Sequence, residues 1–261
     1  MSRHYKIDGF ELPSVTTIIS DCCDKSQGLM GWSAKMVCEW IKQNCDLVSN
    51  KYGDIEFYEV TEEDLDNAQK NYRKASQTAL DVGSKVHACI ESYLKTCKEP
   101  KIENPQVLAA FVAFLEWKDE VNLEPIYLEQ TVRGKYWAGT LDFFGWIKLP
   151  EWKEHKLYVI DWKSSKAIYA SEMGPQIAAY RSACKKQSGW LHTYGEGTEP
   201  KYENNVEGSG ILRLDKETGL PEWKDFSDRY EKDLKVFNKM VELYMLRHKI
   251  IANKAGWKET A

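Results

Sequence analysis

The spacing of apolar residues indicates helices in the first half of the chain and strands in the second. Residues 29–44 place apolar side chains three and four positions apart, which predicts a helix. Thr61 is followed by three acidic residues, as is typical of an N-cap and first helical turn, and we expect this polar helix to reach about Leu80. Before both, the β-branched residues of Phe10 to Ile19 predict a short extended segment.

Two further helices are predicted before the strands begin. Gly83 is expected to end the polar helix and to start another that runs to about Thr96. Asn104 and Pro105 suit an N-cap and the first helical position, so a helix is predicted from there to about Val121. The apolar stripe of the helix after Gly83 is formed by Val82, Val86, Ile90, Tyr93, Leu94 and Cys97.

Strand patterns dominate the second half. β-branched and aromatic runs bounded by Gly, Pro and charged residues predict strands over residues 126–132, 136–147 and 157–163. The expected order continues with a helix over 171–187, a long exposed loop over 188–208, a strand over 210–214 and a helix over 228–251. This order predicts an α/β core preceded by a helical N-terminal portion.

Composition fits one soluble globular domain. The 261 residues are 43% hydrophobic and 29% charged, and no segment has the composition of a linker. We expect a single domain over residues 1–261, with a mainly helical N-terminal portion (1–122), a region of sheet and helix (123–215) and a C-terminal helix (216–261).

Charge and hydropathy narrow the possible partners and the location. The N-terminal residues lack an apolar signal core, and no apolar run approaches the roughly 20 residues that span a bilayer. A cytoplasmic protein without membrane contact is expected. The net charge of −4 argues against a surface coated with positive charge for nonspecific nucleic-acid binding, although a local basic groove stays compatible with it.

The seven cysteines are scattered, odd in number and without a C-x-x-C pair. Reduced thiols are therefore expected. An iron–sulfur cluster and a structural zinc site are weaker alternatives, since no group of cysteines lies near the C-terminus.

Charged residues interrupt two of the predicted strands. Asp142 lies in one, and Asp161 and Lys163 lie in the next. Alternate residues of a strand share a face, so Asp161 and Lys163 point the same way, and a hairpin would bring both carboxylates together. Buried carboxylates need a cation, and a divalent metal beside a lysine suits phosphate chemistry. The alternative is an exposed ion pair on a surface hairpin, because Asp-x-Lys alone is a weak motif.

Two helices add candidate residues. His87 lies at the border of the apolar stripe with Glu91 one turn later, where a neutral imidazole can bind a metal or serve as a core histidine. Gln176 and Tyr180 also lie one turn apart, and they either pack on the sheet or reach Lys163 or a phosphate. Basic residues that either contact a nucleic-acid backbone or line a solvated face are Arg181, Lys185 and Lys186.

The order of these motifs resembles the RecB-like branch of the PD-(D/E)XK nucleases, especially phage-encoded and mitochondrial genome-maintenance exonucleases. The motifs are Gly83-Ser-Lys-Val-His87, Gly139-Thr-Leu-Asp142, Ile160-Asp-Trp-Lys163 and Gln176-x-x-x-Tyr180. The opening Pro13-Ser-Val-Thr-Thr-Ile18, with Gly28, Leu29 and Trp32, is also similar. The likeness covers about residues 12–183. Each motif alone is weak, but four in this order and spacing are specific.

The resemblance implies a restriction-endonuclease-like core, in which helices flank a mixed central sheet, and it implies a role for each matched residue. The metal ligands would be His87, Asp142, Asp161 and the backbone carbonyl of Trp162. Lys163 would be the catalytic lysine, acting with the two aspartates. The supporting residues would be Gln176 and Tyr180, with Glu91 and Glu129 able to join a metal through water. Contacts to nucleic acid would come from Ser14 and Thr16 in an N-terminal arch and from Arg181 and Lys166. Members with an iron–sulfur cluster use a C-terminal cysteine group that this sequence lacks.

The function that follows as a hypothesis is a deoxyribonuclease that depends on one or two Mg²⁺ or Mn²⁺ ions. It would hydrolyse phosphodiester bonds with metal-activated water and no covalent intermediate, as an exonuclease on single strands or DNA ends. Its setting would be phage or genomic DNA replication, recombination or repair, with phage or host proteins as possible partners, and the monomer is the favoured state. The alternatives are a structure- or sequence-specific endonuclease on the same core and a noncatalytic nucleic-acid-binding module.

Overall fold

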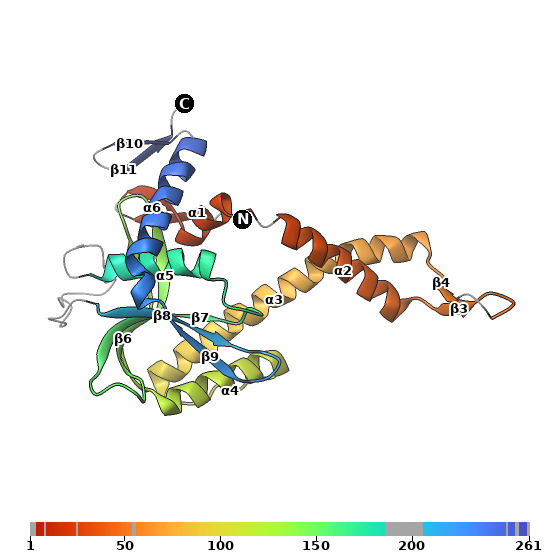
Figure 1. Cartoon of the computed structure of the whole chain (residues 1–261), viewed down its shortest axis with the longest axis horizontal. Coiled ribbons are helices and arrows are strands. Elements are labelled where there is room, and N and C mark those ends of the chain that lie inside the picture. Colours follow the sequence, from red (N-terminus) through yellow and green to blue (C-terminus); the bar gives the residue numbers. More distant parts are fainter. Residues whose placement is uncertain are drawn as a thin grey trace. The chain divides into compact units, whose positions relative to one another are not determined.

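The computed structural model describes residues 4–7, 9–24, 26–53, 56–185, 206–248, 250–253 and 256–259 (Figure 1). The chain divides into two compact units. The main unit consists of Met1–Cys23 and Lys85–Ala261, and the helical unit of Asp24–Ser84. Most of the predicted loop over residues 188–208, together with Lys186, lies outside the described residues.

A five-stranded mixed sheet forms the centre of the main unit, in the order β5-β6-β7-β8-β9. Its strands are β5 (Asn122–Arg133), β6 (Ala138–Lys148), β7 (Lys156–Lys163), β8 (Gly208–Leu214) and β9 (Pro221–Asp225). β7 and β8 are parallel, and the other neighbours are antiparallel. A parallel pair needs a long crossover, which here includes the helix α5.

Helices cover both faces of this sheet, with α4 and α5 on opposite sides of the strands (Figure 1). The helices wholly within the main unit are α1 (Val15–Cys22), α4 (Pro105–Glu120), α5 (Ala170–Cys184) and α6 (Tyr230–Arg247), and Ser227–Arg229 forms a 3-10 turn. The ring of Trp162 lies 5.5 Å from that of Phe114 in α4. Leu157 and Val159 lie on the other face of β7, where they pack with Ile177 of α5. Helices α1 and α6 line the same hydrophobic core. The predicted mixed α/β sheet flanked by helices is therefore confirmed.

Local signals located several element ends correctly. Asn104 caps α4, because its side chain accepts hydrogen bonds from the N–H groups of Gln106 (2.9 Å) and Val107 (3.1 Å).

The last long helix ends at Arg247, earlier than expected, and a small ribbon follows it. That ribbon, β10 (Ile250–Asn253) with β11 (Gly256–Glu259), and strand β9 were not predicted.

The N-terminal extended segment was predicted too long. β1 (His4–Ile7) and β2 (Phe10–Pro13) form a ribbon, but the chain turns helical at Val15. The hydroxyl of Ser14 accepts the N–H of Thr17 at 2.9 Å and so caps α1. Val15, Ile18 and Ile19 share one buried side of that helix. Capping and burial therefore outweigh the strand preference of a β-branched run.

The helical unit contains two antiparallel helical segments joined by a ribbon. Its elements are α2 (Ser26–Asn44), β3 (Leu47–Ser49), β4 (Glu56–Tyr58) and the first part of α3 (Glu62–Thr96). The side-chain amide of Asn71 donates to the carbonyl of Met36 at 3.1 Å, so the two helices lie against each other. Thr61 caps α3, as predicted, since its hydroxyl accepts the N–H of Asp64.

The predicted helix break at Gly83 is wrong. α3 continues through this glycine to Thr96, and the boundary between the two units falls inside it. A glycine costs a helix interior only about 1 kcal/mol relative to alanine, so one glycine does not have to end a helix whose flanking residues are buried. Val82 and Val86 are such residues, while Cys97 lies exposed beyond the helix end and does not extend the stripe.

All seven cysteines lie in the described part of the chain, and none of them forms a disulfide. Among the described residues, no helix has both the length and the apolar character that crossing a membrane requires.

Candidate metal centre

Three carboxylates lie side by side across three adjacent strands. Glu129 lies between two paired residues of β5, opposite Asp142 in β6. The β6–β7 ladder ends at the pair Phe143–Ile160, and Asp142 and Asp161 are the next residue of each strand beyond that pair. Residues opposite each other on neighbouring strands project from the same face of a sheet. The strand register alone therefore gathers the three acidic side chains into one row.

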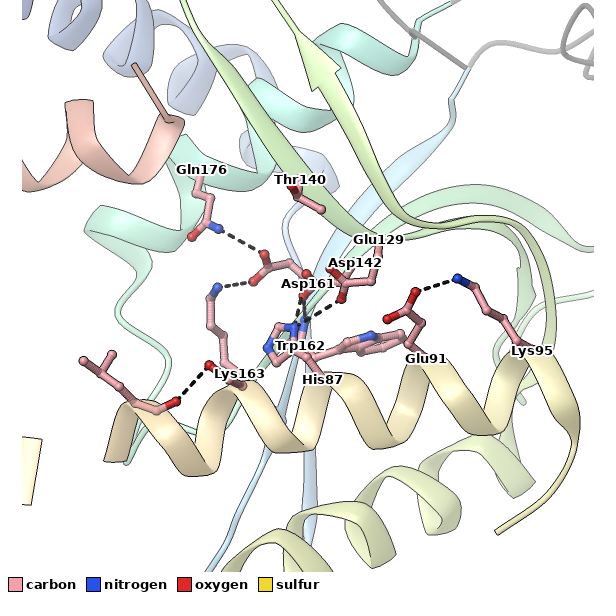
Figure 2. A network of polar contacts seen from close by, with 12 residues as sticks. His87, Glu91, Lys95, Glu129, Thr140, Asp142, Asp161, Trp162, Lys163 and Gln176 are labelled. Atoms are coloured by element: carbon pink, nitrogen blue, oxygen red, sulfur yellow. Dashed lines mark hydrogen bonds and ion pairs between the residues drawn. The ribbon is translucent and has the colours of Figure 1, made fainter. Parts of the chain in front are cut away.

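His87 approaches this row from α3 (Figure 2). Its Nδ1 atom lies 3.3 Å from a carboxylate oxygen of Asp142 and 3.5 Å from one of Glu129. His87, Glu129 and Asp142 each offer a ligand atom, and these atoms all lie within 4.8 Å of one another. One imidazole nitrogen and two carboxylates at this separation are a donor set that suits a divalent cation.

Asp161 lies next to this group and has partners of its own. The ammonium of Lys163 is 2.5 Å from its Oδ2 atom, and the side-chain amide of Gln176 donates to its Oδ1 atom at 3.0 Å. Asp161 is almost fully buried. The second oxygen of Asp142 accepts the backbone N–H of Trp162 at 2.7 Å, which ties the group to β7. Figure 2 shows Gln176 and Lys163 each joined to one oxygen of Asp161, beside His87 and Asp142.

The pKa values indicate a surplus of negative charge. Burial tends to lower the pKa of His87, but Asp142, Glu129 and Asp161 outweigh it and raise this pKa to about 10. Burial raises the pKa of Asp161 to about 6, although Lys163 opposes the change. Without a metal, an imidazole with this pKa is protonated at pH 7, and its charge together with that of Lys163 offsets only two of the three carboxylates. A divalent cation would balance that surplus, so the residues present fit one.

Glu129 has an unusual backbone. Its φ is +49°, inside the left-handed region, although it lies within a strand and is not a glycine. This conformation costs an L-residue about 1–2 kcal/mol. Such positions gather at functional sites, where the surrounding structure holds them in place. Here the pairing of β5 with β6 on both sides of Glu129 holds the strained residue beside Asp142 and His87.

Close packing of Tyr180 accounts for the glycine at the start of the motif Gly139-Thr-Leu-Asp142. The ring of Tyr180 packs on the backbone of Gly139, where an added Cβ would lie 2.5 Å from a ring carbon. Only glycine permits this approach, three residues before Asp142. Burial, reinforced by the charge of Asp161, raises the pKa of Tyr180 well above its usual value. Tyr180 thus stays neutral and helps to enclose the acidic row.

The structure brings together most of the residues singled out in the sequence. The imidazole of His87, the carboxylates of Asp142 and Asp161, the ammonium of Lys163 and the side chains of Gln176 and Tyr180 all converge. Trp162 contributes its N–H to Asp142, while its indole is buried against α4. Glu91 points away from the row and pairs with Lys95 at 2.5 Å (Figure 2).

The residues expected to contact nucleic acid lie in varied surroundings. The hydroxyl of Ser14 is buried as the cap of α1 and bonds Thr16 at 2.9 Å. Arg181 is buried, and its guanidinium donates to the carbonyl of Glu207 at 2.6 Å, a contact that supports the chain before β8. Lys166 is exposed just beyond β7, and Lys185 lies over the ring of Tyr230.

Sequence reasoning underrated Glu129. It was expected to reach a metal only through water, whereas its carboxylate contacts His87 in the same way as Asp142 does. A polar residue in the middle of the apolar run of 126–132 was the available signal. Neither its positive φ nor its position opposite Asp142 can be read from that pattern.

No protein-family model matches this chain, and no curated protein matches its sequence.

Proposed function

We propose that this protein is a metal-dependent deoxyribonuclease with a PD-(D/E)XK core of the RecB-like branch, acting as an exonuclease on single-stranded DNA or DNA ends. The observation that carries the proposal is the convergence of His87, Glu129 and Asp142 within 4.8 Å, beside the ion pair of Asp161 and Lys163. The order of sequence motifs supports the same reading, because residues far apart in the chain meet in the way that the resemblance implies.

The donor set supports Mg²⁺ or Mn²⁺ as the cofactor. His87, Glu129 and Asp142 would hold the ion, and Asp161 is near enough to Asp142 for the charge of Asp142 to raise the pKa of Asp161. Carboxylate oxygens suit both ions. When bound, such an ion supplies Lewis-acid chemistry at a phosphate oxygen and makes water more acidic.

The protein's own residues would position and stabilise the reacting phosphate. Hydrolysis adds water across a P–O bond and leaves a phosphomonoester and a hydroxyl, with no covalent intermediate. The positive charge of the Lys163 ammonium would stabilise the negative charge that develops on the phosphate in the transition state. Asp161 holds this ammonium in place, and Gln176 in turn fixes the carboxylate of Asp161. Buried Tyr180 and Trp162 keep water away from the back of the site.

A cleavage time course tests the proposal. The purified protein is incubated with 5′-labelled and 3′-labelled DNA, single- and double-stranded, in Mg²⁺, in Mn²⁺ and in EDTA. We expect products to accumulate with either metal and to be absent with EDTA. Cleavage of closed circular DNA would instead indicate an endonuclease on the same core. DNA binding without cleavage under all conditions would indicate a noncatalytic module and would contradict the proposal.

A further inference from the structure

Two threonine side chains continue the acidic row along the strands. Thr140 lies two residues before Asp142 in β6 (Figure 2), so the two side chains project from the same face, about 6.8 Å apart along the strand. Thr131 of β5 pairs with Thr140, just as Glu129 lies opposite Asp142. Both threonines are half-buried, so part of each stays accessible. One step along the strands, the row therefore changes from carboxylates to neutral hydroxyls.

The N-terminal ribbon holds one of these hydroxyls. The hydroxyl of Tyr5, in β1, lies 3.0 Å from the hydroxyl of Thr140. Tyr5 also packs against a small buried cluster of Ile7, Leu12 and Ala138, which fixes the ribbon on the start of β6. Two residues that are 135 positions apart in the chain thus meet next to the acidic row.

This hydrogen bond leaves the proton of Thr140 available. A hydroxyl has one proton to donate and can also accept, and a phenol is a stronger donor than an aliphatic hydroxyl. With Tyr5 as the donor, Thr140 accepts and keeps its own proton for another partner. Among the described residues, the side chain of Thr140 has no second hydrogen-bond partner. Its hydroxyl is therefore an oriented, neutral donor beside the carboxylates.

A neutral donor at this position suits a second phosphate of a bound DNA strand. When the scissile phosphate lies at the metal centre, with Lys163 beside it, the next phosphate of the strand comes close to the same carboxylates, which repel it. Hydroxyls of serine, threonine and tyrosine are frequent partners of phosphate oxygens. A hydroxyl next to the row offsets this repulsion for a phosphate that neither the metal nor Lys163 reaches.

We propose that the hydroxyl of Thr140 binds the phosphate next to the scissile one, and that Tyr5 positions this hydroxyl. Thr140 contacts the substrate, whereas Tyr5 acts only through Thr140. The inference rests on the proposed nuclease function, and it extends that function by naming the residues that align the strand at the metal centre.

Steady-state cleavage of single-stranded DNA in Mn²⁺ tests it with five variants of the full chain. Thr140→Val removes the hydroxyl while keeping the shape, Thr140→Ser keeps the hydroxyl, and Tyr5→Phe removes only the phenol oxygen. The fourth variant combines Thr140→Val with Tyr5→Phe. Tyr52→Phe, at a 73% exposed position of the helical unit, is the matched control. Mn²⁺ affinity and the unfolding temperature are measured for each variant.

The expected result is a change in KM with kcat and Mn²⁺ affinity unchanged, because the lost contact lies outside the reacting group. KM should rise about tenfold in Thr140→Val and about threefold in Tyr5→Phe. Thr140→Ser and the control should behave like the natural protein. The combined variant should match Thr140→Val, since Tyr5 has no hydroxyl left to position.

Oligonucleotides with one neutral methylphosphonate linkage at successive positions locate the contact. The natural protein should lose affinity when the linkage next to the scissile one is neutral, and Thr140→Val should not respond to that change. A merely structural role of Thr140 would not produce this difference.

Several outcomes would overturn the inference. An unchanged KM in Thr140→Val, with or without a lower unfolding temperature, would show that the pair only anchors the ribbon. Equal losses in kcat and Mn²⁺ affinity would assign both residues to the metal centre, and additive effects in the combined variant would remove the positioning role of Tyr5. Absence of cleavage by the natural protein would instead contradict the proposed function, and the inference would fall with it.

Discussion

Asp161 lies in β7, and Asp215 directly follows the neighbouring parallel strand β8. The two carboxylates differ in the partners that surround them. Asp215 accepts hydrogen bonds from the N–H groups of Glu217 (2.8 Å) and Thr218 (3.0 Å) and from Arg213 (3.0 Å). These donors lower its pKa to about 2. Burial instead raises the pKa of Asp161 to about 6, with the help of Asp142 and against Lys163.

The difference separates a structural carboxylate from a candidate functional one. The turn after β8 supplies Asp215 with every partner its charge needs, so ionisation stabilises the fold. The centre of the sheet gives Asp161 one ammonium and one amide while placing two more carboxylates nearby. A charge that the fold itself leaves undercompensated points to an external cation.

The largest effect should follow from Lys163→Ala. If this ammonium stabilises the charge that develops on the phosphate, DNA cleavage should fall by about 10²–10³-fold, as for other single transition-state donors. The measurement is the initial cleavage rate at saturating Mg²⁺. Lys153→Ala, at an exposed position in the turn between β6 and β7, is the matched control and should keep full activity. Unchanged cleavage in Lys163→Ala would remove this lysine from the mechanism.

Asp161→Asn and Asp215→Asn should differ in metal affinity. Loss of the carboxylate charge at Asp161 should weaken Mn²⁺ binding at least about tenfold while the protein stays folded, because the amide can still accept from Lys163. Asp215→Asn should leave Mn²⁺ affinity unchanged. Isothermal titration with Mn²⁺ measures both. Equal affinities for the two variants would erase the distinction between the two aspartates.

Asp215→Asn, which should leave Mn²⁺ affinity unchanged, should instead lower the stability of the fold. Asp215→Asn should lower the free energy of unfolding at pH 7 by about 1 kcal/mol, since the amide replaces a charged acceptor of three hydrogen bonds. The folded-state pKa lies below the unfolded one, so the contribution of Asp215 is complete above about pH 4 and is lost as pH falls toward 2. Urea unfolding at several pH values should therefore show the two proteins converging in acid. A gap that stays constant down to pH 2 would rule out this carboxylate as its source.

The smallest expected effect concerns the backbone of Glu129. Glu129→Gly should relieve a strain of about 1–2 kcal/mol, but the freedom of glycine in the unfolded chain costs about 0.5–1 kcal/mol, so we expect a net gain of about 0.5 kcal/mol. Glu129→Gln keeps the strain and is the matched control. Both should bind Mn²⁺ more weakly than the natural protein. A glycine variant that is less stable than the glutamine variant would show that this conformation is not strained.

Elements fixed by neighbouring residues could be predicted, and those fixed by distant contacts could not. The start of α4 was predicted correctly because it depends on two adjacent residues, the N-cap Asn104 and Pro105 at the first helical position. α1 was missed because burial of Val15 and Ile18 by α5 and α6 overrides their strand preference. The extent of α3 was misjudged at Gly83 because a glycine's cost is small beside the packing of its neighbours.

The candidate site follows the same rule. Asp161 and Lys163 share a strand, so their common direction could be read from the alternation of side chains. The meeting of His87 with Asp142 was expected only through the resemblance to a family, since 55 positions separate them along the chain. The direct contact of Glu129 with His87 depends on the register of β5 against β6 and on a left-handed residue, and both are set by the whole sheet.

The different contacts of the two Asp142 oxygens matter for the design of a variant that could be crystallised with an oligonucleotide. One oxygen faces the imidazole of His87 and the other accepts the backbone N–H of Trp162, so mutating this aspartate would disturb the strand packing as well as the candidate metal site. If the protein cleaves DNA as proposed, a crystallographer who wants an inactive but intact protein to soak with oligonucleotides should keep Asp142 and substitute Lys163.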